Sequence, residues 1–171
     1  MEKKVTSHIV KGLIISLILF VLDLVAGFAG FKYAEWYKWI PGLIMFALFI
    51  WACVSYASQM ENKVTFGSVF GHGFKTSAVT ACVSVIFTIL SVLVIFPETR
   101  EIALDQARKQ MEAKGQLTED QIDNAINITK KMFMPFAIIG VIVFTLLAGA
   151  VASLIGAAVV KKNPPTPFEN Q

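Results

Sequence analysis

The chain has 171 residues, the length of one domain, but its composition is not that of a soluble protein. Hydrophobic residues make up 56% and charged residues 16%, and the mean hydropathy is +0.66. Soluble domains contain about a quarter charged residues. The net charge of +3 is too small and too dispersed for a basic patch. These values argue against a soluble enzyme, a secreted disulfide scaffold and a nucleic-acid-binding protein.

Four apolar stretches are long enough to cross a bilayer, at about residues 10–31, 39–58, 74–96 and 133–160. About 20 helical residues, each rising 1.5 Å, cross about 30 Å of hydrocarbon. Backbone groups in lipid must be hydrogen-bonded within their own segment, so the spans are predicted to be helices. We therefore predict an all-α fold, an integral membrane four-helix bundle within a single domain. A retained first span is favoured over a cleaved signal peptide, because its apolar run is too long and no A-x-A site follows.

Residues 97–132 form the only sizeable polar region and are predicted to be a helical hairpin inserted between the third and fourth spans. Asp105 and Lys109 have i, i+4 spacing, which favours a first helix, and Gly115 is placed to end it. Thr118 and Gln121 match a capping box that begins the second helix. The hairpin is either a partner-binding projection or a soluble spacer, and the spacer is favoured.

Two further segments flank the spans. Residues 63–75 place three phenylalanines at steps of four, which predicts a short helix lying in the membrane interface. His72 in this segment is interpreted as an interfacial histidine without a role, rather than a metal ligand or a proton carrier. The chain has only two histidines, so we expect no metal site. We also expect no cofactor and no catalytic residue. A proline-rich tail at 161–171 follows the last span.

Small and hydroxylated residues repeat at helical spacing in the third and fourth spans. Lipid offers no hydrophobic drive for helix association, so close backbone approach must hold spans together. Helix packing is therefore favoured over a substrate path for these faces. The predicted packing residues are Ser77, Ser84, Ser91, Gly149 and Gly156.

Asp23 is the one charged residue deep within the first span. Matching depths from the common membrane face puts it beside Thr88 and Thr145, whose hydroxyl groups can donate to a carboxylate. These three residues are the candidate intramembrane polar site, because an ionisable group at this depth is a functional-site hypothesis by default. No lysine or arginine lies at that depth, so a neutral structural acid is favoured over a titrating one.

The chain resembles the DUF4199 family, a bacterial family of four-span membrane proteins of unknown function found mostly in Bacteroidetes. The resemblance rests on the basic N-terminus, the VTFGSVFGHGF segment, the helical insert and the KKNPPTPFENQ tail. It covers essentially the whole chain and implies an inner-membrane protein without established catalytic residues. Lysine and arginine counts on the two sides are nearly tied, and the first helix favours cytoplasmic termini.

We expect a non-enzymatic scaffold or partner subunit in the bacterial envelope. Its predicted partners are the lipid bilayer and either further copies of the chain or another envelope protein, with no nucleic acid. The alternative is a small transporter or a proton-coupled membrane component that uses Asp23. A membrane enzyme is the least favoured class, because H-E-x-x-H, G-x-S-x-G and paired carboxylates within one span are absent from the sequence.

Overall fold

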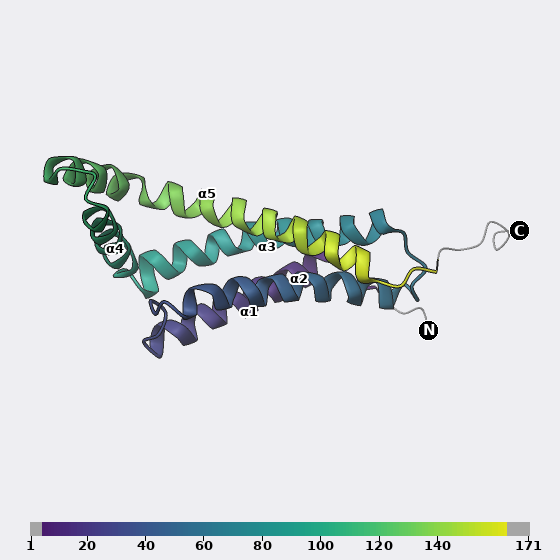
Figure 1. The fold of residues 1–171 in the computed structure, drawn as a ribbon. Helices are drawn as coiled ribbons and strands as arrows, with labels where there is room; N and C mark the ends of the chain where they lie inside the picture. Colours follow the sequence, from purple (N-terminus) through teal and green to yellow (C-terminus); the bar gives the residue numbers. More distant parts are fainter. Residues whose placement is uncertain (1–4, 164–171) are drawn as a thin grey trace, which may run out of the picture. The chain divides into compact units, whose positions relative to one another are not determined.

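The computed structural model describes residues 5–163, which are all helical or connecting loops (Figure 1). A short 3-10 helix leads into the second helix, and a π-helical turn, Ser91–Ile95, follows the third. The α-helices are α1 (His8–Phe28), α2 (Ile40–Gln59), α3 (Phe66–Leu90), α4 (Thr99–Lys114) and α5 (Glu119–Val159). The predicted all-α fold is confirmed. Lys3, Lys4 and residues 164–171 of the predicted tail lie outside the described residues.

Four helical segments are long and apolar enough to cross a membrane: His8–Phe28, Tyr37–Gln59, Phe66–Ile95 and Glu119–Val159. Large apolar side chains along them are exposed, among them Leu43 and Leu147, at 68% and 63%. An apolar outer surface of this extent is unfavourable in water and is the expected lipid-facing surface of a membrane protein. The four predicted spans therefore have their counterparts in the structure.

The prediction of a short interfacial helix at residues 63–75 is wrong, because α3 is continuous from Phe66. Thr65 and Ser68 cap its start reciprocally: Ser68 N donates to Thr65 Oγ1 at 3.2 Å, and Thr65 N donates to Ser68 Oγ at 3.0 Å. Gly73 also lies where helices approach closely, so packing compensates for the low helix propensity of glycine. The third span therefore begins eight residues earlier than predicted.

Helix α5 is much longer than the predicted fourth span. Helix α5 has 41 residues and includes Pro135, so the second arm of the hairpin and the fourth span form one helix. At 1.5 Å per residue it is about 60 Å long, roughly twice the hydrocarbon thickness. Proline is tolerated in membrane helices where neighbouring groups satisfy the carbonyl that it leaves free.

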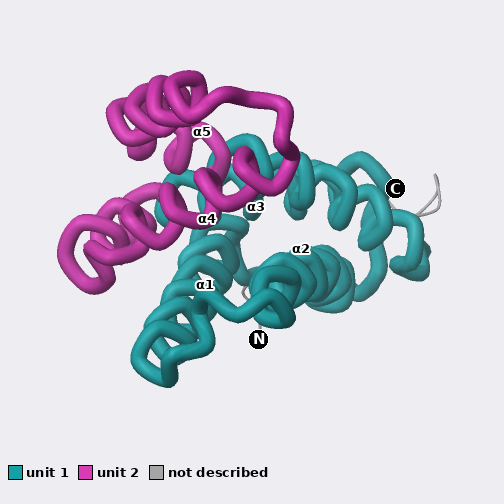
Figure 2. The backbone as a smooth tube through the Cα atoms, turned by 60° about the vertical axis from the view of Figure 1, so that its left-hand side comes forward, with its two compact units in different colours: residues 1–84, 142–171 teal, residues 85–141 magenta. Residues whose placement is uncertain are grey.

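The chain divides into two compact units, shown in different colours in Figure 2. Residues 1–84 and 142–171 form the first, which we call the bundle unit, and residues 85–141 form the second, the hairpin unit. The bundle unit contains α1, α2, most of α3 and the C-terminal part of α5. The hairpin unit contains the rest of α3, all of α4 and the first half of α5.

Both ends of the described chain lie at the connection between α2 and α3. Thr6 N donates to Gln59 Oε1 at 2.7 Å, and Asn163 N donates to Asn62 O at 2.8 Å. Four spans with both ends on one side account for these two contacts. We call this part of the bundle unit its terminal end.

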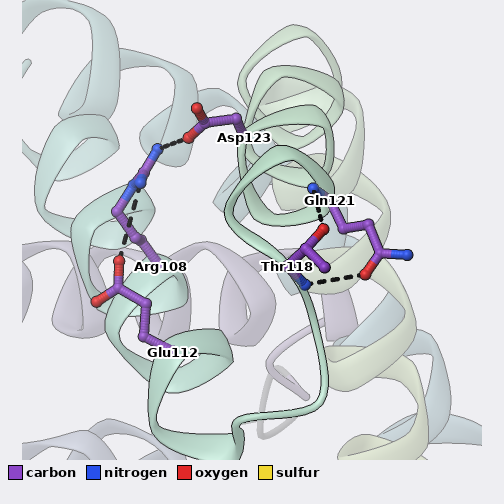
Figure 3. Close-up of polar contacts among 5 residues, drawn as sticks. All are labelled: Arg108, Glu112, Thr118, Gln121 and Asp123. Carbon is purple, nitrogen blue, oxygen red and sulfur yellow. Dashed lines mark hydrogen bonds and ion pairs between the residues drawn. The ribbon is translucent and has the colours of Figure 1, made fainter.

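The hairpin unit has the predicted local structure. Gly115 ends α4 with a left-handed φ of 59°, and the Lys109–Asp105 ion pair spans 2.7 Å. Figure 3 shows the capping box, in which Thr118 N donates to Gln121 Oε1 at 3.0 Å and Gln121 N donates to Thr118 Oγ1 at 3.4 Å. The short-range predictions for this segment are therefore confirmed.

Glycine permits close helix contacts within the bundle unit. A Cβ atom on Gly149 of α5 would lie 2.1 Å from Ser77 Cβ of α3, and one on Gly156 would lie 2.6 Å from Cys53 Cβ of α2. A Cβ atom on Gly12 of α1 would lie 2.7 Å from the Val79 side chain of α3. Real Cβ contacts are never this short, so each helix pair would have to separate to accommodate a methyl group.

We predict that Gly149→Ala lowers the free energy of unfolding by about 1 to 3 kcal/mol, because the added methyl overpacks the α3–α5 contact. Gly140→Ala is the matched control on the same helix, since a Cβ atom there meets nothing within 4 Å. That control should be neutral or slightly stabilising. Thermal unfolding in detergent measures both, and equal midpoints for the two variants would contradict the close contact.

Candidate functional site

Buried polar side chains run through the bundle unit instead of an entirely apolar core. They belong to Lys11, Ser16, His72, Thr76, Ser77, Thr80, Thr145 and Ser153. Several hydroxyl groups donate to carbonyls of their own helix, as Thr76 does to His72 O at 2.8 Å. Thr80 also donates to Gly12 O at 3.3 Å and so links α3 to α1. Hydrogen bonds of this kind help to hold helices together in lipid, where water is absent.

Lys11 is the most unusual member of this group. Its side chain belongs to the fourth residue of α1 and is 1% exposed. Its ammonium donates to Ala52 O of α2 at 3.1 Å and lies 5.9 Å from the centroid of the Tyr56 ring. A carbonyl dipole and an aromatic face each stabilise a cation, but neither carries a full negative charge.

His72 of α3 lies in the same cluster. Its ring stacks on Tyr56 with the centroids 4.1 Å apart, and its edge meets His8 of α1 at 6.2 Å. The side chain is 9% exposed, and its Nε2 atom has no hydrogen-bond partner among residues 5–163. Three helices thus bring a lysine, two histidines and a tyrosine together at the terminal end, and we call these four residues the terminal cluster.

Cys53 and Ser153 lie next to this cluster. A Cβ atom on Gly73, the residue after His72, would lie 2.4 Å from Cys53 Sγ and 2.5 Å from Ser153 Oγ. The Cys53 thiol also reaches Val69 O at 3.9 Å. Helices α2, α3 and α5 are therefore in tight contact just inside the terminal cluster, which fixes the position of His72.

Sequence reasoning missed the terminal cluster, although one signal was available. Lys11 lies at the edge of the first span predicted at residues 10–31, and the sequence alone suggests an interfacial His72 without a role. Both lie near the start of a span that enters from the same membrane face, and Tyr56 lies near the end of a span that returns to it. Depth matching of the kind applied to Asp23 would have grouped these three residues.

Asp23 has a cationic partner, contrary to the expectation that none was available. Lys32 Nζ lies 2.8 Å from Asp23 Oδ1 and 2.9 Å from Oδ2. The Lys32 side chain is 12% exposed and that of Asp23 is 34% exposed, so the pair is partly buried. The expectation that no cation was available to Asp23 is therefore wrong.

The predicted length of the first span accounts for this error. The span was expected to reach residue 31, but α1 ends at Phe28, so Asp23 lies only five residues from its end. Gly30 adopts a left-handed φ of 79°, and Lys32 N donates back to Ala26 O at 3.1 Å. The chain therefore folds back on the helix end, as glycine after a helix allows, and brings Lys32 to Asp23.

The other predicted site residues lie as follows. Thr145 is 4% exposed in the bundle unit, whereas Thr88 belongs to the hairpin unit, so a shared site with Asp23 stays a prediction. Ser77 meets Gly149 at the α3–α5 contact described above. Ser84 is half-buried at the end of the bundle unit's part of α3, and Ser91 is buried in the hairpin unit.

Residues 5–163 contain no group of three or more His, Cys, Asp or Glu side chains arranged to hold a metal ion. Cys53 and Cys82 are both free thiols. Buried or partly buried ionisable side chains of the bundle unit gather at two places: the terminal cluster, and the Asp23–Lys32 pair near the α1–α2 connection.

We predict that Lys32→Met destabilises the protein by about 0.5 to 3 kcal/mol, because it leaves the Asp23 carboxylate without its cation. The double variant Asp23→Asn/Lys32→Met should recover most of that loss. Lys38→Met is the control, since its partner Glu35 is 86% exposed and such pairs contribute little. Thermal unfolding in detergent tests this cycle, and strictly additive effects would show that the ion pair is not formed.

Comparison with known proteins gives one family match. A search of curated proteins and a search of solved structures each found no match. The model of the family described as "Protein of unknown function (DUF4199)" matches residues 10–162, from Val10 in the first span to Lys162 after the last. Because this match includes all four candidate spans almost completely, the chain belongs to the DUF4199 family.

Proposed function

We propose that this protein is a non-enzymatic subunit of the bacterial inner membrane that works by associating with another envelope protein through its hairpin unit. The observation that carries the proposal is the ion pair between Arg108 and Asp123 (Figure 3). It joins α4 to α5 across 15 residues of sequence. A spacer between two spans needs no such connection.

Further contacts support a hairpin of defined shape. Arg100 donates to Lys130 O at 2.6 Å, which joins the start of α4 to α5 a second time. Hydrogen bonding to Asp123 raises the pKa of Arg108, so its guanidinium group stays charged at every physiological pH. Leu117 and Ile128 are 43% and 61% exposed in the polar segment 97–132 of this unit. The rest of the hairpin unit belongs to apolar spans. Exposed apolar side chains in a fixed polar segment are typical of a protein-binding surface.

The alternative, a transporter or a proton-coupled component centred on Asp23, has less support. Its premise is a carboxyl group deep within the first span, but Asp23 lies only five residues from the end of α1 and forms an ion pair with Lys32. Transport by alternating access also usually relies on repeated groups of spans, which four spans without a detectable repeat do not provide.

We predict that mild-detergent purification of the wild-type protein recovers a partner in fixed stoichiometry, and that Arg108→Glu reduces this recovery at least about tenfold. The substitution places two carboxylates together and should separate α4 from α5. The exchanged variant Arg108→Asp/Asp123→Arg should restore binding. Lys109→Glu is the control, since Lys109 pairs within α4 and not across the hairpin. Purification of the wild type without any such partner would contradict the proposal.

We also propose that both termini are cytoplasmic, which places the hairpin on the periplasmic side. A cysteine introduced by Lys114→Cys, at the exposed end of α4, should react with a membrane-impermeant maleimide in intact spheroplasts. A cysteine introduced by Lys161→Cys, at the terminal end, should react only after lysis. The reverse pattern would contradict the proposed orientation.

A further inference from the structure

The ammonium group of Lys11 is buried, and the structure provides fewer hydrogen-bond acceptors around it than it has N–H donors. It carries three N–H groups, and the structure gives it one acceptor, Ala52 O at 3.1 Å. No carboxylate pairs with it among residues 5–163. A buried cation without an anion is unfavourable, because it has lost its water without gaining an opposite charge.

His72 adds a second unsatisfied group in the same place. Its Nε2 atom lacks a hydrogen-bond partner in the described chain, although the residue is only 9% exposed. Tyr56 is in contact with both residues: its ring stacks on His72 at 4.1 Å and lies 5.9 Å from Lys11 Nζ. Lys11 Nζ and His72 Nε2, two incompletely bonded polar groups of the described chain, are therefore neighbours around one aromatic ring.

The depth of this cluster corresponds to the lipid headgroups. Lys11 lies three residues after the start of α1, and Tyr56 lies three residues before the end of α2, which is about 5 Å along each helix. His72 lies six residues after the start of α3, about 9 Å along it. The headgroup region adds about 5 to 8 Å to each side of the hydrocarbon core. The cluster is thus at or just below the level of lipid phosphates.

The surrounding charges also favour an anion. Helices α1 and α3 both begin at the terminal end, so the positive ends of their dipoles face this region. The described residues here include Lys63, Lys75, Lys161 and Lys162, against the single carboxylate of Glu61. Basic pockets between membrane helices on the cytoplasmic side bind lipid phosphates in other proteins.

We propose that Lys11 and His72 form a binding site for a phosphate group, with the Tyr56 ring as its wall. Lysine binds phosphate as a point charge on a flexible stem, so its ammonium can exchange the Ala52 carbonyl for a phosphate oxygen. An Nε2–H group on His72 donates to a second oxygen. The phosphate belongs either to an acidic phospholipid headgroup or to a free phosphate ion.

The test uses the full chain, delipidated in a phosphate-free maltoside detergent. Phosphatidylglycerol is added in one arm and inorganic phosphate in the other, and native mass spectrometry and the thermal midpoint are recorded. We expect one tightly retained phosphatidylglycerol per chain and an increased midpoint. Stabilisation by phosphatidylglycerol alone assigns the site to a lipid, and stabilisation by both ligands assigns it to phosphate in general.

Two variants and one control decide whether the terminal cluster is responsible. Lys11→Met keeps the length of the side chain without its charge and should weaken phosphatidylglycerol binding at least about tenfold. His72→Phe keeps the stack on Tyr56 and should weaken binding several-fold even if Lys11→Met fails to fold. Lys109→Met, an exposed lysine of α4, should change binding less than about twofold. Absence of binding by the wild type, or an equal loss in Lys109→Met, would overturn the proposal.

Discussion

The absence of water from the bilayer core is the constraint on which this structure depends. It removes the hydrophobic drive between helices, so close contacts must come from small residues and hydrogen bonds. The bundle unit meets this requirement at Gly12, Gly149 and Gly156, where neighbouring helices leave no room for a methyl group. The large apolar side chains point outward instead, as Leu43 and Leu147 do. The described core therefore mixes polar groups with apolar side chains such as Ile15 and Phe49, and the outer surface of the spans is largely apolar.

The same constraint makes the two charged features informative. Asp23 lies close to the end of α1, and Lys32 returns from the connector to pair with it. Lys11 lies at the opposite end of the same helix and has a carbonyl and an aromatic ring but no carboxylate in the described chain. A charge that has its counter-ion is explained by folding alone. A charge without one points to something that the protein binds, and for this reason the terminal cluster carries the further inference.

Much of the fold was predictable from the sequence, because its signals are local. Apolar runs define the spans, and single residues such as Gly115 and Thr118 define helix ends in the hairpin unit. One error came from helix continuity: the spacing of three phenylalanines suggested a separate short helix at 63–75, but α3 is continuous from Phe66. Packing of neighbouring helices decides such cases, and one sequence does not contain that information.

The candidate site was less predictable, since it depends on which side chains meet across helices. A difference of three residues in the end of α1 was enough to bring Lys32 to Asp23 and change the interpretation of that acid. The cluster of Lys11, Tyr56 and His72 draws on three helices and has no sequence motif. Their common depth in the membrane is the one signal by which the sequence could have grouped them.

The most direct test of the central claim measures whether the outward apolar side chains lie in lipid or in water. Spin labels at Leu43→Cys and Leu147→Cys, in a background with Cys53→Ala and Cys82→Ala, can be examined in proteoliposomes by their accessibility to oxygen and to a water-soluble nickel complex. The account predicts high accessibility to oxygen and low accessibility to nickel at both positions, with the opposite result at Lys114→Cys. High accessibility to nickel at Leu43→Cys and Leu147→Cys would contradict the account, because these faces would then lie in water.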